Sequence, residues 1–189
     1  MIKVNSTKDK ILKAAQKLFS DYDYDQVSIK QICDLSKVSN GSFYHQIGSK
    51  ENLMKILYIE LSEKAIIDLL KKTRMKDPIE KIISVINMHI EYALKYGYNF
   101  IKQILLLNLK SNDPSREPDV FNDFIEQYVR EALKQNMFDN RYEIKHIVLS
   151  FVSSINGLVY EWALSKESID LKAEASIVTH SLLERFKNK

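Results

Sequence analysis

The chain has 189 residues, of which 45% are hydrophobic and 28% are charged, with only 4 glycines and 3 prolines. So few turn-forming residues exclude a sandwich of many short strands and favour long helices, and the apolar fraction excludes a disordered chain. The single cysteine, Cys33, excludes a disulfide framework and a multi-cysteine zinc site, and it suits a reducing compartment. The first residues hold no apolar signal core, and no apolar run approaches about 18 residues. We therefore expect neither export nor a membrane span, and predict a cytoplasmic protein.

The net charge of +3 is concentrated at the start of the chain. Residues 1–50 carry 8 lysines against 5 aspartates, so the remaining residues sum to zero. This charge is small, but its sign permits an N-terminal segment that approaches phosphates and a neutral body that does not.

Three short helices are predicted within the first 50 residues. Ser6 and Asp9 form a capping box at the start of a helix whose apolar residues recur every three or four positions. A second helix begins at Ser28, and after three connecting residues Ser39 caps a third. This spacing is typical of a helix-turn-helix, in which the second helix of the pair enters the major groove of DNA. Plain structural hairpins share the same spacing.

The third helix has the side chains that a DNA-reading helix needs. Its first turn is small and polar, so its backbone can come close to DNA, and Asn40 and Ser42 can reach base edges. Tyr44 and His45 follow on the next half-turn, where they can donate hydrogen bonds to phosphates. Each serine here also has a simpler interpretation as a helix cap.

The rest of the chain is predicted to be helical as well. A helix from about 49 to 73 carries apolar residues on several faces, which indicates a bridge between two modules. Four further helical stretches follow Asp77-Pro78 before the last helix, with a break at Gly97 and the clearest loop at residues 111–118. We predict an all-α fold of about nine helices, with an N-terminal helix-turn-helix domain in residues 1–50 and a second helical domain in residues 51–189.

Residues 6–53 resemble the DNA-binding domain of the tetracycline-repressor (TetR) family of bacterial regulators. The matching residues are spaced in a fixed order and include Ile11-Leu12, Leu18-Phe19, Ser28-Ile29, Val38-Ser39, Gly41-Ser42-Phe43-Tyr44-His45 and Ser49-Lys50-Glu51-Asn52-Leu53. The resemblance implies a homodimeric repressor with two helix-turn-helix heads on one palindromic DNA operator. It also implies a ligand cavity inside the second domain and a dimer interface at its end.

The predicted DNA-binding residues combine this resemblance with the chemistry of the third helix. They are Ser28, Lys37, Ser39, Asn40, Gly41, Ser42, Tyr44, His45 and Lys50. The chain departs from the family pattern at three positions. Asp23 and Lys37 stand where the family usually has glycine, and Ile47 stands where it usually has phenylalanine.

The last two helices, at about 142–165 and 170–187, are predicted to form the dimer interface. They are amphipathic, and the first carries Ser150, Ser153 and Gly157 at helical spacing, which lets a partner helix approach closely. Two helices from each protomer would make a four-helix bundle about a two-fold axis. The alternative is a hairpin that packs only against its own domain.

Aromatic residues with a few polar groups predict the effector site. An apolar cavity with a few hydrogen-bonding groups suits a small hydrophobic molecule, although aromatics at helical spacing also build ordinary cores. The candidate residues are His89, Tyr92, Tyr96, Phe100, Gln103, Phe124, Tyr128, Asn156 and Tyr160.

The sequence carries no recognisable catalytic or metal-binding motif. It has no G-x-S-x-G, P-loop or dinucleotide fingerprint, and its four histidines lie far apart. We therefore expect no enzyme activity, no metal and no cofactor, and predict a DNA-binding repressor that a small hydrophobic effector releases. The alternatives are a regulator without an effector, an activator, and a helical scaffold that binds protein.

Overall fold

The computed structural model describes residues 6–73, 75–110, 120–165 and 168–188, apart from the side chains of 61–66, 68–73 and 107–110. Over these residues the chain forms eight α-helices and one short 3-10 turn, with no strand, so the all-α prediction is confirmed. The loop predicted at 111–118 lies outside the described residues.

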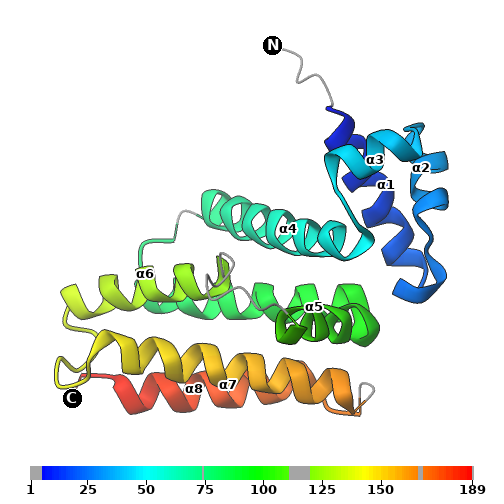
Figure 1. The fold of residues 1–189 in the computed structure, drawn as a ribbon. Helices are drawn as coiled ribbons and strands as arrows, with labels where there is room; N and C mark the ends of the chain where they lie inside the picture. Colours follow the sequence, from blue (N-terminus) through cyan, green and yellow to red (C-terminus); the bar gives the residue numbers. More distant parts are fainter. Residues whose placement is uncertain (1–5, 74, 111–119, 166–167, 189) are drawn as a thin grey trace.

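The first three helices form a small lobe at one end of the molecule, here called the head (Figure 1). It contains α1 (Thr7–Asp21), η1 (Tyr24–Gln26), α2 (Ile29–Ser36) and α3 (Asn40–Gln46). The predicted caps are present, because the Ser6 hydroxyl accepts from the Asp9 N–H at 3.1 Å and the Ser28 hydroxyl accepts from the Gln31 N–H at 3.2 Å. Fully buried side chains, including Ile11, Ile32 and Phe43, hold the three helices together.

Helix α4 (Lys50–Thr73) leaves the head and runs along the rest of the molecule (Figure 1). Its N-terminus is capped by Ser49, whose hydroxyl accepts from the Asn52 N–H at 3.1 Å. An ion pair of 2.8 Å between Lys8 of α1 and Glu60 of α4 joins the two helices.

The remaining helices form a bundle, here called the body. They are α5 (Pro78–Lys110), α6 (Val120–Lys134), α7 (Ile144–Leu164) and α8 (Leu171–Phe186). Helix α5 packs against all of the others and also against α4 and α1. It bends at Gly97, whose φ of 76° and ψ of 167° are not helical. The two helices predicted on either side of Gly97 are therefore the two halves of one kinked element.

Helix α7 is long and apolar enough, by length and composition alone, to cross a membrane. Core helices of water-soluble proteins pass the same test, since both need a long apolar surface. In this fold α7 packs against α5, α6 and α8, and it buries eight side chains, among them Phe151 and Trp162. We interpret it as the central helix of the bundle.

Candidate nucleic-acid interface and effector pocket

The turn between α2 and α3 is tight and contains a strained residue. Lys37 ends α2 in the left-handed conformation, with φ 56° and ψ 42°. That conformation is unfavourable for a residue with a side chain, which explains why glycine is customary at this place in the pattern that the sequence resembles. The Val38 N–H donates to the Cys33 carbonyl at 3.1 Å and closes the turn. The lysine is tolerated, and its side chain is exposed next to α3.

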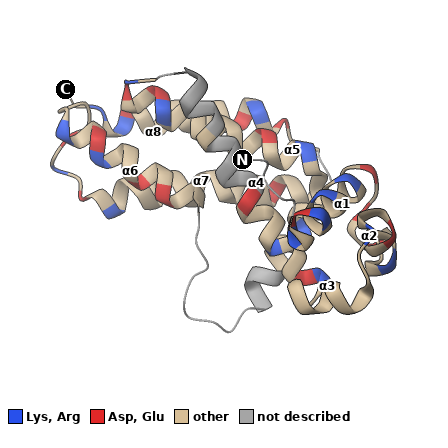
Figure 2. Ribbon diagram, turned by 90° about the horizontal axis from the view of Figure 1, so that it is seen from above, with Lys and Arg blue, Asp and Glu red and all other residues tan. Residues whose placement is uncertain are grey.

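Helix α3 is buried on one face and exposes polar groups on the other. Phe43 is 0% exposed and fixes the helix against the head, while Asn40, Gly41, Tyr44 and His45 are exposed. Helix α3 contains no Lys, Arg, Asp or Glu, whereas lysines and acidic residues lie on α1 and α2 beside it (Figure 2). Its outer surface therefore offers hydroxyls, an amide and two aromatic side chains to a partner.

The first turn of α3 is held in place by its own serines. The Ser39 hydroxyl accepts from the Ser42 N–H at 3.2 Å and lies 2.9 Å from the Ser42 hydroxyl. Gly41 lies between them, and a Cβ added there would meet nothing within 4 Å. Packing inside the free protein therefore gives no reason for glycine at this position.

Besides Ser39 and Ser42, two more of the predicted DNA-binding residues, Ser28 and Lys50, are already engaged inside the head. Ser28 is exposed, but its hydroxyl belongs to the capping box of α2. Lys50 is half-buried, with its ammonium donating to the Tyr24 carbonyl and lying 3.8 Å from the centre of the Tyr24 ring. Burial lowers the pKa of Lys50. In the free protein Lys50 thus ties the start of α4 to η1, and its contact with DNA stays a prediction.

The predicted effector residues fall into separate groups. Tyr92, Tyr96 and Phe100 are buried on α5 and contact one another, with ring centres 4.5 Å apart for the two tyrosines and 5.0 Å apart for Tyr96 and Phe100. Tyr58 of α4 meets the edge of Tyr92 at 5.6 Å. We call these four side chains the aromatic cluster. It lies where α4, α5 and the head come together.

A second group surrounds His89 deeper in the body. Its imidazole stacks on Phe121 of α6 at 4.3 Å and hydrogen-bonds the Asn156 side chain of α7. Burial lowers the pKa of His89 from 6.5 to about 4, so the ring is neutral at physiological pH. Two of the predicted residues, His89 and Asn156, are therefore brought together.

The other predicted effector residues lie outside these groups. Phe124 and Tyr128 stack on each other along α6 at 6.1 Å. Tyr128 also has the ammonium of Lys81 5.1 Å from its ring centre. Gln103 and Tyr160 are half-buried on α5 and α7.

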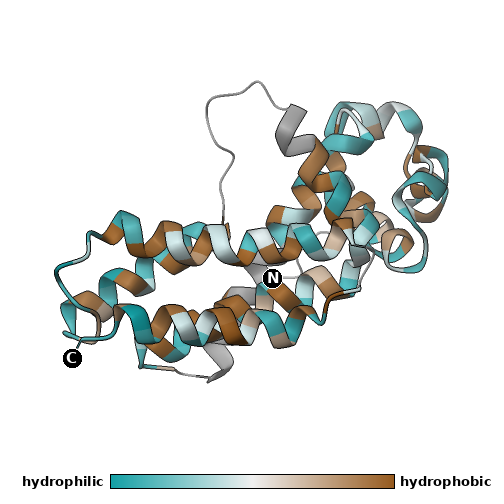
Figure 3. Ribbon diagram, turned by 90° about the horizontal axis from the view of Figure 1, so that it is seen from below, coloured by the Kyte–Doolittle hydropathy of each residue, from teal (hydrophilic) through white to brown (hydrophobic). Residues whose placement is uncertain are grey.

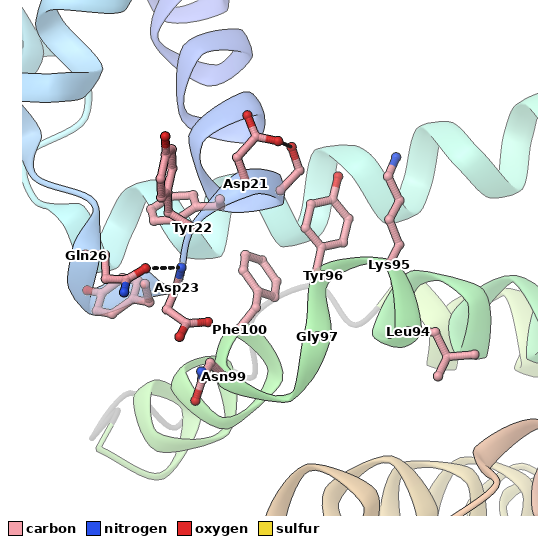
Figure 4. Close-up of a pocket in the computed structure, with 13 residues that line it drawn as sticks. Asp21, Tyr22, Asp23, Gln26, Leu94, Lys95, Tyr96, Gly97, Asn99 and Phe100 are labelled. Atoms are coloured by element: carbon pink, nitrogen blue, oxygen red, sulfur yellow. Dashed lines mark hydrogen bonds between the residues drawn. The ribbon is translucent and has the colours of Figure 1, made fainter. Parts of the chain in front are cut away.

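A pocket of about 340 Å³ lies between the head and the kink of α5 (Figure 4). Residues 19–24 and Gln26 form one wall, and residues 94–97, Asn99 and Phe100 form the other. Tyr96 and Phe100 belong both to this pocket and to the aromatic cluster. The Tyr96 hydroxyl accepts from the Gln16 side chain of α1 at 3.2 Å, and Phe100 meets the edge of Phe19 at 6.4 Å.

Sequence reasoning missed Tyr58 and Gln16, which complete this junction. Tyr58 is one aromatic residue in a helix that is apolar on several sides, and Gln16 is one polar residue in α1. Neither had a distinguishing signal, because their partners are 34 or more positions away in the sequence. Among the described residues no group of three or more His, Cys, Asp or Glu could hold a metal ion.

An exposed polar helix on a short-turn helix pair, joined to a helical body with buried aromatic groups, defines a DNA-binding regulator of the helix-turn-helix class. Residues 11–56 match the family of bacterial regulatory proteins called tetR, and residues 113–188 match the C-terminal region of MAATS-type transcriptional repressors. The chain belongs to the TetR family of transcriptional regulators, which are not enzymes.

Individual relatives agree with this assignment. The chain is 27% identical to the HTH-type transcriptional regulator UidR of Escherichia coli K12 over 182 residues, which cover 90% of this chain and 86% of UidR. Its fold resembles FadR from Bacillus subtilis in complex with stearoyl-CoA, with a TM-score of 0.72, 19% identity, and coverage of 92% of this chain and 96% of FadR. It also resembles RolR in complex with resorcinol, with a TM-score of 0.72, 16% identity, and coverage of 95% and 87%.

Proposed function

We propose that the chain is a cytoplasmic transcriptional repressor that binds a palindromic operator as a homodimer and is released by a small hydrophobic effector. Residues 1–50 read the DNA, residues 51–189 bind the effector and form the dimer, and α4 connects the two parts. The observation that carries this proposal is α3, which is rigidly anchored by Phe43 and exposes only uncharged polar and aromatic groups.

The proposed DNA contacts of the head fall into two groups, one to base edges and one to the phosphate backbone. Asn40 and Ser42 on the first turn would meet base edges in the major groove, with Gly41 allowing close approach. Tyr44 and His45, together with Ser28, Ser39, Lys37 and Lys50, would contact phosphates. Because α3 itself carries no lysine or arginine, attraction to the phosphate backbone would come from the lysines of its neighbours.

The proposed dimer interface is the outer surface of α7 and α8. Leu149 and Leu164 of α7 are 62% and 61% exposed, and Ile177 of α8 is 60% exposed. Between them α7 presents Ser153 and Gly157, also exposed, and a Cβ added at Gly157 would meet nothing within 4 Å. Apolar and polar segments alternate along the helices on the underside of the body (Figure 3). Large apolar side chains beside small ones suit a close contact with a second copy.

The route from effector to DNA would run through the junction between body and head. Helix α5 contacts the head directly through the Gln16–Tyr96 hydrogen bond and the Phe19–Phe100 ring contact. Helix α4 contacts it through the Lys8–Glu60 ion pair. A molecule bound in the body that shifts α4 or α5 would therefore change the separation of the two heads. FadR and RolR, whose structures hold stearoyl-CoA and resorcinol, support a small organic effector.

Binding to the DNA upstream of its own gene tests this function. We expect the purified full chain to bind that DNA more tightly than random DNA, with an affinity that falls steeply as salt is raised. Tyr44→Ala should weaken binding to every sequence, whereas Asn40→Ala should change which sequences are preferred. Lys134→Ala, an exposed lysine on α6, is the matched control and should change neither. Equal losses for Asn40→Ala on specific and random DNA would remove Asn40 from the base-reading set, and no binding at low salt would sink the proposal.

A further inference from the structure

One buried polar group in the aromatic cluster has no partner among the described residues. Tyr92 is 8% exposed, and its hydroxyl oxygen is inaccessible to solvent and makes no hydrogen bond. Leaving a buried hydroxyl unpaired costs about 1–3 kcal/mol, and native proteins seldom tolerate this without a functional reason. The neighbouring tyrosine is satisfied, because the Tyr96 hydroxyl accepts from Gln16. The Tyr92 hydroxyl is therefore the polar group of the cluster that is left without a hydrogen bond.

The Tyr92 hydroxyl can donate a hydrogen bond to an acceptor on a partner, and its oxygen can also accept one. Burial, with the nearby Tyr96 and Tyr58, raises the pKa of Tyr92 well above its ordinary value, so the phenol stays protonated. Three rings surround the Tyr92 ring, with centre-to-centre distances of 5.6 Å for Tyr58, 4.5 Å for Tyr96 and 6.2 Å for Phe100. The surroundings thus combine flat apolar surfaces with one hydrogen-bond donor.

The described charges around the cluster favour an uncharged partner. Among the described residues the buried polar or charged side chains are Ser36, His89, Asp139 and Thr179, so none is a lysine or arginine. His89, one helical turn from Tyr92, is neutral because burial lowers its pKa to about 4. Lys95 holds its ammonium 5.4 Å from the Tyr96 ring centre, but it is exposed. An anion at Tyr92 would find no buried cation among the described residues to offset its loss of hydration.

We propose that the aromatic cluster between α4 and α5 is where the effector is recognised, and that it takes an uncharged molecule with a flat apolar body and an oxygen that accepts from the Tyr92 hydroxyl. This inference rests on the proposed function, since it assumes that the regulator has an effector. The rings stack on the apolar body, and the acceptor (a ketone, ester or ether oxygen) pairs the phenol.

The position of the cluster links recognition to the head. Tyr96 lies between Tyr92 and Gln16 of α1, and Tyr58 belongs to α4, which begins at the head. Tyr96 and Phe100 also line the pocket of about 340 Å³ between the head and the kink of α5. Displacing Tyr96 would break its hydrogen bond with Gln16 and so loosen the contact between body and head.

Three naphthalenes of matched shape test the ligand class. 2-Acetylnaphthalene is uncharged with an acceptor, 2-naphthoate is anionic, and 2-ethylnaphthalene is uncharged without an acceptor. We expect the full-length protein to bind 2-acetylnaphthalene at least tenfold more tightly than 2-naphthoate and about fivefold more tightly than 2-ethylnaphthalene, by titration calorimetry. If 2-naphthoate binds as tightly, or if none of the three binds, the inference is wrong.

Tyr92→Phe tests the hydroxyl directly. The ring is kept, and an unpaired buried hydroxyl is removed, so the melting temperature of the free protein should not fall. Affinity for 2-acetylnaphthalene should fall about fivefold, and affinity for 2-ethylnaphthalene should stay the same. Tyr142→Phe, between α6 and α7 and far from the cluster, is the matched control and should change neither. An unchanged affinity of Tyr92→Phe for 2-acetylnaphthalene would overturn the role of the hydroxyl.

Operator binding, measured on the same samples, separates this inference from the proposed function. If DNA upstream of the gene is bound but the naphthalenes fail as described, the ligand class is wrong and the repressor remains. If the naphthalenes bind as expected but the DNA is not bound, the recognition site stands as a binding site and the repressor falls.

Discussion

Helix α3 and helix α5 carry the two proposed sites, and they treat their polar groups in opposite ways. The groups of α3 are exposed, and those that must be satisfied in the free protein are satisfied by local serine caps. The tyrosines that α5 contributes to the aromatic cluster are buried, and the hydroxyl of one of them, Tyr92, has no partner among the described residues. The exposed polar groups of α3 suit contact with a large partner such as DNA. The unpaired hydroxyl of Tyr92 is buried in the body, so it suits contact with a small molecule.

The largest expected effect concerns the proposed dimer interface on α7 and α8, which would hold two bodies together and so place two heads on one operator. Leu149→Glu combined with Ile177→Glu places two charges on the outer surface of α7 and α8, and both positions are more than half exposed, so the fold should survive. We expect monomers in sedimentation, and a loss of operator affinity of about 1,000-fold, or about 4 kcal/mol, because one head reads only half of the site.

Leu106→Glu is the matched control for this pair, since Leu106 on α5 is also an exposed leucine, at 38%. It should leave both the dimer and the operator affinity unchanged. A stable dimer in the double variant would refute the proposed interface.

The next effect is the pH dependence of the free energy of unfolding that the buried His89 of the body produces. The unfolded chain binds a proton at His89 near pH 6.5, whereas the folded chain binds it only near pH 4. Unfolding therefore takes up a proton between these values, and the free energy of unfolding falls as the pH is lowered through this window. The contribution lost is about 3 kcal/mol.

Urea unfolding of the wild type and of His89→Gln between pH 7 and pH 4 measures this contribution. The stability advantage of the wild type over the variant should shrink as the pH falls. Parallel stability curves would show that His89 is not held neutral by burial.

Gly41→Ala separates what the free head needs from what its partner needs. No neighbour of the added methyl lies within 4 Å, and alanine favours helix over glycine, so the free protein should gain up to about 1 kcal/mol of stability. DNA affinity should nevertheless fall about tenfold, because the methyl would stand where the helix approaches the groove. Thermal melting and DNA-binding anisotropy measure the two effects, with Gln46→Ala on the last turn of α3 as the control. Unchanged DNA affinity would place Gly41 outside the interface.

The smallest effect concerns the strained turn before α3. Lys37→Gly removes a side chain from a left-handed residue and should stabilise the head by up to about 1 kcal/mol, with a modest loss of affinity for all DNA. Asn136→Gly is the matched control, because asparagine tolerates its φ of 56° better and should gain less. A lower melting temperature for Lys37→Gly would contradict the strain.

The head could be predicted almost completely from the sequence because its signals are local. The capping boxes at Ser6 and Ser28 and the cap at Ser39 all lie within three positions of the N–H groups that they satisfy. The inward bond of Lys50 was not predictable, because its partner Tyr24 is 26 positions away and only the folded turn brings them together.

The body was predictable as helices but not as a site. A buried aromatic residue that packs the core and one that meets a ligand obey the same helical spacing, so the pattern could not separate Tyr92 from Phe124. What distinguishes Tyr92 is an unpaired hydroxyl, and that depends on every neighbour in three dimensions. The break at Gly97 was visible in the sequence, but its consequence, that Phe100 reaches Phe19, was not.

The bend in α5 affects whether the head can be transferred to another protein. The head rests on two separate stretches of chain, the start of α4 and the segment just beyond Gly97. A fragment cut after α4 would lose Phe100 and Tyr96, so that Phe19 would keep only its stacking on Tyr24 and Gln16 would lose its acceptor. A graft of the head onto another regulator should therefore carry the segment of α5 around Gly97, which supplies Tyr96 and Phe100, as well as the head itself.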